Sequence, residues 1–204
     1  MGKNSSNLFI LLFKPPMKVI QVITSFDMGG AERVAINIAQ SPSPNYQYYL
    51  VEVVKGNSDF TNQLKQEFKT NGIIYFCSPF KNKKIALCFF WIWFIWKYLA
   101  IRPQIIHSHT EIPDLALWIF RKIAWICFWI RPQYVRTIHN TELWNDWKGI
   151  GKIVENYYQK HHCNIAISLS TQENYTKVYK GELPPIIYNG LKEVSQKKFP
   201  YLKP

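Results

Sequence analysis

Short apolar runs alternate with segments of helical periodicity along most of the chain. Residues 18–24 form a β-branched run, and after a loop the residues at 31–39 are apolar at helical spacing. The same reasoning predicts strands at 18–24, 46–54, 73–76, 104–108, 134–138, 164–167 and 186–188, and helices at 31–39, 60–70, 85–101, 113–129, 151–160 and 170–179. Strands separated by helices predict an α/β fold with a mostly parallel sheet and helices on both faces.

The loops that follow the strands are expected to lie together. Right-handed crossovers place all strand-to-helix loops of a parallel sheet at one edge, which is where such sheets bind ligands. The candidate loops are 25–30, 107–114 and 139–147.

Composition narrows the class of protein. The 204 residues suit one domain, and 48% hydrophobic against 19% charged residues argues against disorder. A net charge of +12 favours anionic partners. No nucleic acid is expected, because the basic residues are scattered and no nucleic-acid-binding motif is present. The four cysteines are far apart, which favours free thiols in a reducing compartment over disulfides or zinc.

The two ends differ from the middle. The apolar run Leu8–Phe13 is too short to span a membrane and lacks a small-residue cleavage site. We therefore interpret residues 1–16 as an N-terminal extension, 17–191 as the domain, and 192–204 as a basic tail.

Two predicted helices are unusually aromatic. Residues 85–101 contain one Lys, and aromatic side chains fall on every face. At about 25 Å for 17 residues this helix falls short of the hydrocarbon core, so contact with a membrane interface fits better than spanning. Residues 115–130 resemble it. Burial against the sheet is an equally good interpretation, and the two stay open.

The first loop offers a place for a phosphate group. Gly29 and Gly30 lie between a strand and a helix, where a ligand can approach the backbone and the helix N-terminus. Glu32 suits the helix dipole, and Arg33 could face an anion or only solvent. We see no acidic residue closing the second strand in the way that nicotinamide-binding folds need. A tight turn without a ligand explains the pair equally well.

Four segments in order resemble glycosyltransferase family 4. They are Gly29-Gly30-Ala31-Glu32-Arg33 after the first strand, Ile105-Ile106-His107-Ser108-His109, Val135-Arg136-Thr137-Ile138-His139-Asn140, and Ile187-Tyr188-Asn189-Gly190. The resemblance implies a GT-B architecture of two Rossmann-like domains, of which this chain is the N-terminal, acceptor-side one. It also implies sugar transfer with retention of configuration from a nucleotide-sugar, such as a UDP- or GDP-sugar, with no bound metal or other cofactor.

The resemblance also implies roles for particular residues. His139 corresponds to a catalytic histidine near the transferred sugar, and Gly29 and Gly30 would line the cleft. We expect further substrate contacts from Arg33, His109, Glu111 and Asn140. His107 and His109 make a poor metal site without a third ligand, and the carboxylates Asp114 and Glu142 are expected on the loops.

The resemblance breaks off at the C-terminus. Family members are nearly twice as long and carry a donor-binding domain that has no counterpart before Pro204. We therefore expect no transfer by this chain alone, unless a second chain supplies the donor domain. A cytoplasmic protein, peripheral on the inner membrane face, is expected to act on a glycan or lipid-linked acceptor in polysaccharide biosynthesis. The alternative is a non-catalytic module that docks on a membrane or a partner.

Overall fold

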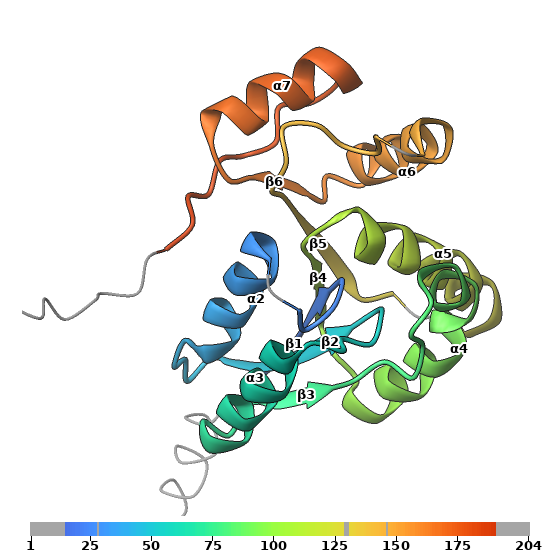
Figure 1. Cartoon of the computed structure of the whole chain (residues 1–204). Helices are drawn as coiled ribbons and strands as arrows, with labels where there is room; N and C mark the ends of the chain where they lie inside the picture. The colour runs from blue at the N-terminus through green and yellow to red at the C-terminus, as the bar shows by residue number, and fades with distance from the viewer. Residues whose placement is uncertain (1–14, 28, 129–130, 146, 191–204) are drawn as a thin grey trace, which may run out of the picture.

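A computed structural model describes residues 15–27, 29–128, 131–145 and 147–190. The strands are β1 (Met17–Ile23), β2 (Tyr46–Glu52), β3 (Ile74–Phe76), β4 (Ile105–Ser108), β5 (Gln133–Ile138) and β6 (Asn164–Ala166). The helices are α2 (Gly30–Gln40), α3 (Asp59–Thr70), α4 (Lys83–Ile101), α5 (Glu111–Phe128), α6 (Lys148–Lys160) and α7 (Leu169–Tyr179). They alternate along the chain as the apolar pattern predicts (Figure 1).

The sheet has six parallel strands in the order β3-β2-β1-β4-β5-β6. This confirms the predicted α/β fold with a parallel sheet. Ile20 in the central strand β1 aligns with Tyr49 of β2 on one side and Ile106 of β4 on the other. The prediction of a strand at 186–188 is wrong. In this segment only Ile186 pairs with the sheet, through one isolated bridge to Ala166.

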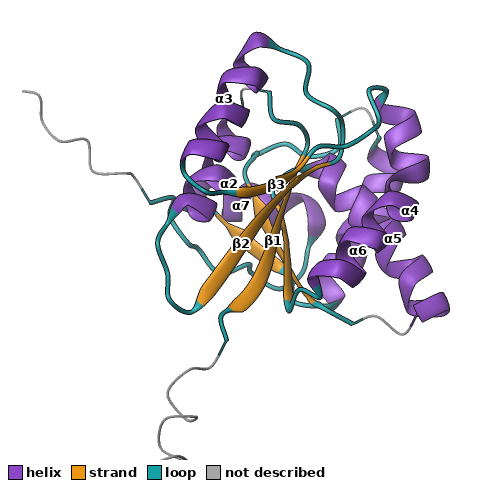
Figure 2. Cartoon of the chain, turned by 90° about the horizontal axis from the view of Figure 1, so that it is seen from below, coloured by secondary structure: helices purple, strands orange, loops and turns teal. Residues whose placement is uncertain are grey.

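Helices cover both faces of the sheet, with α2 and α3 on one face and α4, α5 and α6 on the other (Figure 2). Under α2 and α3, Phe26 packs edge-on against Phe68 at 5.4 Å between ring centroids. A larger core lies under the other helices, where Phe94 of α4 meets Phe120 of α5 at 4.8 Å. The sheet is therefore buried on both sides, as parallel sheets require.

Helix α4 is longer than predicted. The Asn82 side chain caps its first turn by accepting from the backbone N–H groups of Lys84 and Ile85, and Arg102 ends it in a left-handed conformation (φ 53°). Its 19 residues, about 28 Å, make it long and apolar enough to cross a membrane by length and composition, which corrects the shorter estimate.

Burial and membrane contact, the two interpretations of this helix, apply to different faces of α4. Phe90 and Phe94 are completely buried in the core between the helix and its neighbours. The opposite face is exposed and apolar, and Trp96 leaves 70% of its surface accessible. Five exposed residues at alternating spacings of four and three form this stripe: Ile85, Phe89, Ile92, Trp96 and Leu99.

A buried ionic cluster fixes α5 and α6 against β5. The guanidinium of Arg136 contacts a carboxylate oxygen of Asp114 and one of Glu155, each at 2.6 Å. The second Glu155 oxygen accepts from the Trp144 indole at 2.6 Å. Because Trp144 belongs to the loop after β5, the cluster anchors that loop as well as the two helices.

Candidate functional site

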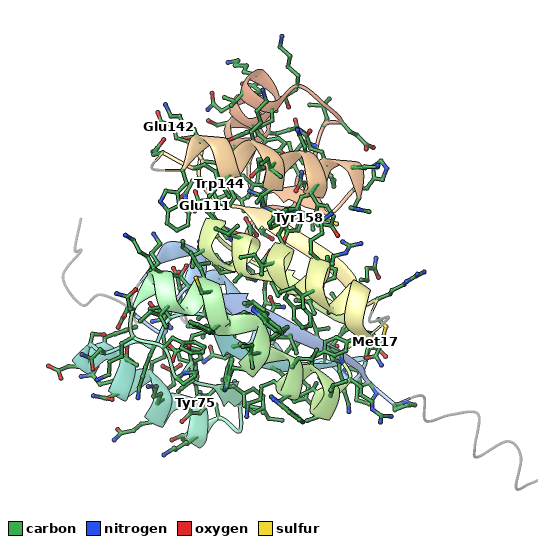
Figure 3. All side chains as sticks on the ribbon, turned by 90° about the vertical axis from the view of Figure 1, so that its right-hand side faces the viewer. Met17, Tyr75, Glu111, Glu142, Trp144 and Tyr158 are labelled. Atoms are coloured by element: carbon green, nitrogen blue, oxygen red, sulfur yellow. The ribbon has the colours of Figure 1, made fainter. Side chains whose placement is uncertain are left out.

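The strands β1, β4 and β5 are neighbours in the sheet, so the loops that follow them meet at one edge. Figure 3 shows Glu111, Glu142 and Trp144 together at one end of the molecule, and Met17, where β1 begins, at the other. The candidate loops predicted from the sequence therefore lie at the carboxyl edge of the sheet.

A chain of hydrogen bonds runs from the interior of the sheet to this edge. The Gln21 carbonyl Oε1 in β1 lies 2.6 Å from Nε2 of His109, which follows β4. Nδ1 of His109 in turn lies 3.2 Å from Nε2 of His139, which follows β5. Gln21 and His109 are buried, and His139 is half-buried. His139 is thus the outermost member of the chain.

This chain selects the tautomer of His139. A carbonyl oxygen only accepts, so Nε2 of His109 must carry the proton that it donates to Gln21. In the neutral ring Nδ1 of His109 is then an acceptor, and Nε2 of His139 donates to it. Neutral His139 therefore has an unprotonated Nδ1, which can accept a hydrogen bond from a sugar hydroxyl.

Both imidazoles are neutral at physiological pH. Burial lowers the pKa of His139 to about 4 and that of His109 well below its usual value. A positive charge on His107 or His139 would lower the His109 pKa further. The two rings can accept and donate hydrogen bonds but do not provide a cation.

His107 completes the cluster of rings. Its ring centroid is 4.2 Å from that of His109, and its Nε2 lies 2.7 Å from the hydroxyl of Thr137 on β5. Burial, followed by the effect of His139, lowers its pKa to about 4. Within the described part of the chain, no three His, Cys, Asp or Glu residues are grouped as a metal site.

The loop after β1 is tied to the loop after β4. The hydroxyls of Thr24 and Thr110 are 2.7 Å apart, and Thr24 also hydrogen-bonds the Glu32 carboxylate. That carboxylate folds back over the start of α2, where it accepts from its own backbone N–H and where burial raises its pKa. A Cβ on Gly29 would lie 2.0 Å from a Glu32 oxygen. Gly29 is thus needed for the close approach of Glu32.

Gly30 begins α2 and has open space around it, since an added Cβ would meet nothing within 4 Å. A helix N-terminus with open space attracts an anion. The Glu32 carboxylate already lies at this position, so an added anion would have to displace it. The exposed Arg33 extends over the ring of Phe60 in α3 at 5.9 Å.

Sequence reasoning overlooked the acidic residue that closes the second strand. β2 ends at Glu52, which is completely buried. Its carboxylate accepts from the backbone N–H groups of Phe26, Gly56 and Ser78 at 3.0–3.1 Å. Glu52 therefore holds the loops after β1, β2 and β3 together, and both of its carboxylate oxygens accept from backbone N–H groups.

A polar pocket of ≈ 220 Å³ opens at the carboxyl edge, and its wall includes Asn140, the residue that follows His139. Its walls include Glu111, Asn140, Glu142 and Asn145, and the Asn140 amide donates to the Glu111 carboxylate at 3.3 Å. Carboxylates and amides suit sugar hydroxyls. Asp114, expected on this loop, is instead buried in α5, where burial raises its pKa to about 7 against the effect of Arg136.

The structure thus brings most of the predicted residues to one edge. Gly29, Gly30, Glu111, His139 and Asn140 all lie in the loops or first helical turns that follow β1, β4 and β5. His109 is completely buried and reaches the edge through His139. Sequence reasoning missed Gln21. The signal was a polar residue inside a β-branched run, in a strand that the topology makes central.

Comparison with known proteins gives a family match and several structural neighbours. The sequence profile of Glycosyltransferase Family 4 matches residues 28–193. No curated protein sequence matches the chain.

Several solved structures share the fold. Anabaena Alr3699/HepE in complex with UDP superposes with a TM-score of 0.63 at 18% identity, covering 86% of this chain and 44% of that one. A glycosyltransferase from Rickettsia africae ESF-5 gives 0.58 at 16% identity, covering 86% and 43%. The apo lipopolysaccharide outer core galactosyltransferase WaaB gives 0.56 at 15% identity, covering 88% and 47%. The chain spans less than half the length of each.

Proposed function

Because the chain belongs to glycosyltransferase family 4, we propose that it is the acceptor-binding half of an enzyme that transfers a hexosyl group from a UDP- or GDP-sugar. The observation that carries the proposal is His139, which is held neutral at the carboxyl edge and precedes Asn140 of the polar pocket. Its unprotonated Nδ1 accepts from a hydroxyl of the transferred sugar. Structures of Anabaena HepE hold UDP and UDP-glucose, which supports a nucleotide-sugar as the donor.

Different residues at the carboxyl edge contact the acceptor and the donor. Glu111 and Asn140 orient an acceptor hydroxyl in the pocket, while the backbone around Gly29 and Gly30 lies beside the donor diphosphate. The bond from the sugar carbon to the phosphate oxygen breaks, and a bond to the acceptor oxygen forms. The acceptor proton leaves with the diphosphate, and configuration is retained. The neutral imidazole stabilises this transfer by hydrogen bonding.

Donor binding belongs to a second domain in this proposal. The nucleotide-sugar is bound by a GT-B C-terminal half, in the same polypeptide or in a second chain, and this chain alone is inactive. Calorimetry with UDP- and GDP-sugars tests the division, on this chain and on a form with a family 4 C-terminal half joined after residue 204. Donor binding is expected only in the joined form. Equal binding by the chain alone would contradict the proposal.

A second candidate function rests on the α4 stripe. A non-catalytic docking module would use the exposed face of Ile85, Phe89 and Trp96 on a membrane, without need of the histidines. We also propose that the transferase itself works in the cytoplasm, peripheral on the inner membrane face, through the same stripe. The basic charge of the chain favours anionic lipid.

A further inference from the structure

An apolar groove lies between α4, α5 and α6, on the same side of the sheet as the α4 stripe. Its volume is ≈ 680 Å³, which is in the range of small-molecule sites. Six apolar side chains form most of its wall: Leu87, Leu115, Trp118, Ile119, Ile150 and Ile153. Ile150 and Ile153 of α6 are about half exposed, so the groove leaves apolar surface open to solvent.

The groove adjoins the polar pocket of the carboxyl edge. Trp147 is part of the wall of both cavities. The Lys83 ammonium lies over that ring at 5.1 Å from its centroid, and Lys83 also lines the polar pocket. Lys84 and Lys148 lie on the groove side. Hydroxyl-binding groups, cations and an apolar channel are therefore neighbours on this surface.

We propose that this surface binds a lipid acceptor in which a hydroxyl-bearing head group is joined through a phosphate to a hydrocarbon chain. The head group lies in the polar pocket beside Glu111 and Asn140. The phosphate pairs with Lys83 and Lys84, and the hydrocarbon chain lies in the groove. The inference deepens the proposed function and rests on it, since it names the acceptor class of the same site.

Charge favours this occupant over a second copy of the chain. Residues 68–110, which include all of α4, contain no Asp or Glu, and Lys84 and Lys148 lie at the groove itself. Two copies meeting at this face would bring like charges together, whereas a phosphate is attracted to them. The polar pocket next to the groove argues against an occupant that is wholly apolar.

The test is binding of monomeric alkyl phosphates to the full chain, followed by tryptophan fluorescence. Decyl phosphate is expected to bind and inorganic phosphate alone is not. Affinity should rise about fourfold for each added methylene, as expected for a chain that leaves water. Ile150→Asp with Ile153→Asp is expected to weaken decyl phosphate binding at least tenfold. The matched control is Leu169→Asp with Val178→Asp on α7, two similarly exposed aliphatic positions that should leave binding unchanged.

The head group has its own control. Lys83→Ala with Lys84→Ala should weaken decyl phosphate but not decyl maltoside, which has the same tail without the charge. The proposal is overturned if the α6 and α7 variants lose binding equally, or if affinity does not depend on chain length. It is also overturned if Trp96→Ser in the stripe abolishes binding while the α6 variant retains it, because that result assigns the lipid to a bilayer-docking face. None of these assays requires sugar transfer, so a failure here leaves the transferase proposal standing.

Discussion

Nε2 of His139 lies 3.2 Å from Nδ1 of His109, although the two residues are 30 positions apart in the sequence. The contact exists because β4 and β5 are adjacent parallel strands and each histidine follows the end of its strand. His109 is buried and hydrogen-bonded to Gln21, so it acts as a positioning residue for His139.

Gln21→Leu is expected to destabilise the domain and release the His139 tautomer. The change leaves the buried Nε2–H of His109 without an acceptor, at a cost of about 1–3 kcal/mol. Urea unfolding gives the cost, and ¹⁵N shifts of the imidazoles report the tautomer. Gln133→Leu, at an exposed position of β5, is the control and should change neither. An unaltered His139 tautomer in Gln21→Leu would show that the relay does not set it.

His109 is expected to make stability depend on pH between about 6.5 and 5. Its pKa is well below 6.5 in the folded protein, so the unfolded state takes up the proton first as pH falls. The stability it contributes is present above pH 6.5 and decreases by about 2 kcal/mol between pH 7 and 5. Unfolding of wild type and His109→Gln at both pH values measures this. Parallel pH profiles would be inconsistent with a buried neutral His109.

The two glycines of the first loop are expected to respond differently to alanine. Gly29→Ala pushes the Glu32 carboxylate from its place, because the new Cβ would lie 2.0 Å from it. Gly30→Ala meets nothing within 4 Å and should stabilise α2 by about 0.5 kcal/mol. Thermal unfolding distinguishes them. We also expect Gly30→Ala to lower sugar transfer in the two-domain form. Unchanged transfer would show that Gly30 serves only as a turn.

Arg136→Met is expected to cost about 3–5 kcal/mol, because it leaves the carboxylates of Asp114 and Glu155 buried without their cation. The loop that carries Trp144 should loosen at the same time. Urea unfolding and hydrogen exchange of residues 140–147 measure both effects. Lys177→Met, at an exposed position of α7, is the control. A cost below about 1 kcal/mol would show that the cluster does not hold the helices.

The α4 stripe is expected to bind anionic vesicles. Phe89→Ser with Trp96→Ser removes two of its most exposed rings while leaving the buried face intact. Flotation with vesicles that contain phosphatidylglycerol should recover the wild type and lose the variant. Tyr188→Ser, at an exposed ring elsewhere, is the control. Flotation that both variants retain would exclude the stripe as the membrane contact.

The hydrophobic periodicity of the sequence was sufficient to predict the α/β architecture. The β-branched run at 18–24 and the alternation after it predict a parallel sheet, because local period and crossover handedness leave few alternatives. They also place Gly30 and His139 at one edge. The incorrect strand at 186–188 shows the limit of predicting strands from periodicity. A short apolar run does not reveal whether a neighbouring strand is available for pairing.

Contacts between distant side chains could not be predicted in the same way. The sequence predicts Asp114 to be a loop carboxylate. It is instead buried in α5, where Arg136 of β5 compensates its charge. The role of Gln21 depends on His109 being 88 positions away in the sequence and adjacent in space. Such pairs depend on register and packing, which local pattern does not contain.

The most direct test of the account is sugar transfer by the two-domain form with His139 intact and with His139→Ala. Radiolabelled UDP- and GDP-hexoses are supplied with a decyl phosphate glycoside as acceptor, and circular dichroism confirms that the fold is retained. The account predicts a fall in transfer of about 100-fold or more in the variant, as when one transition-state donor or acceptor is lost. Transfer at the wild-type rate by a folded His139→Ala protein would contradict it.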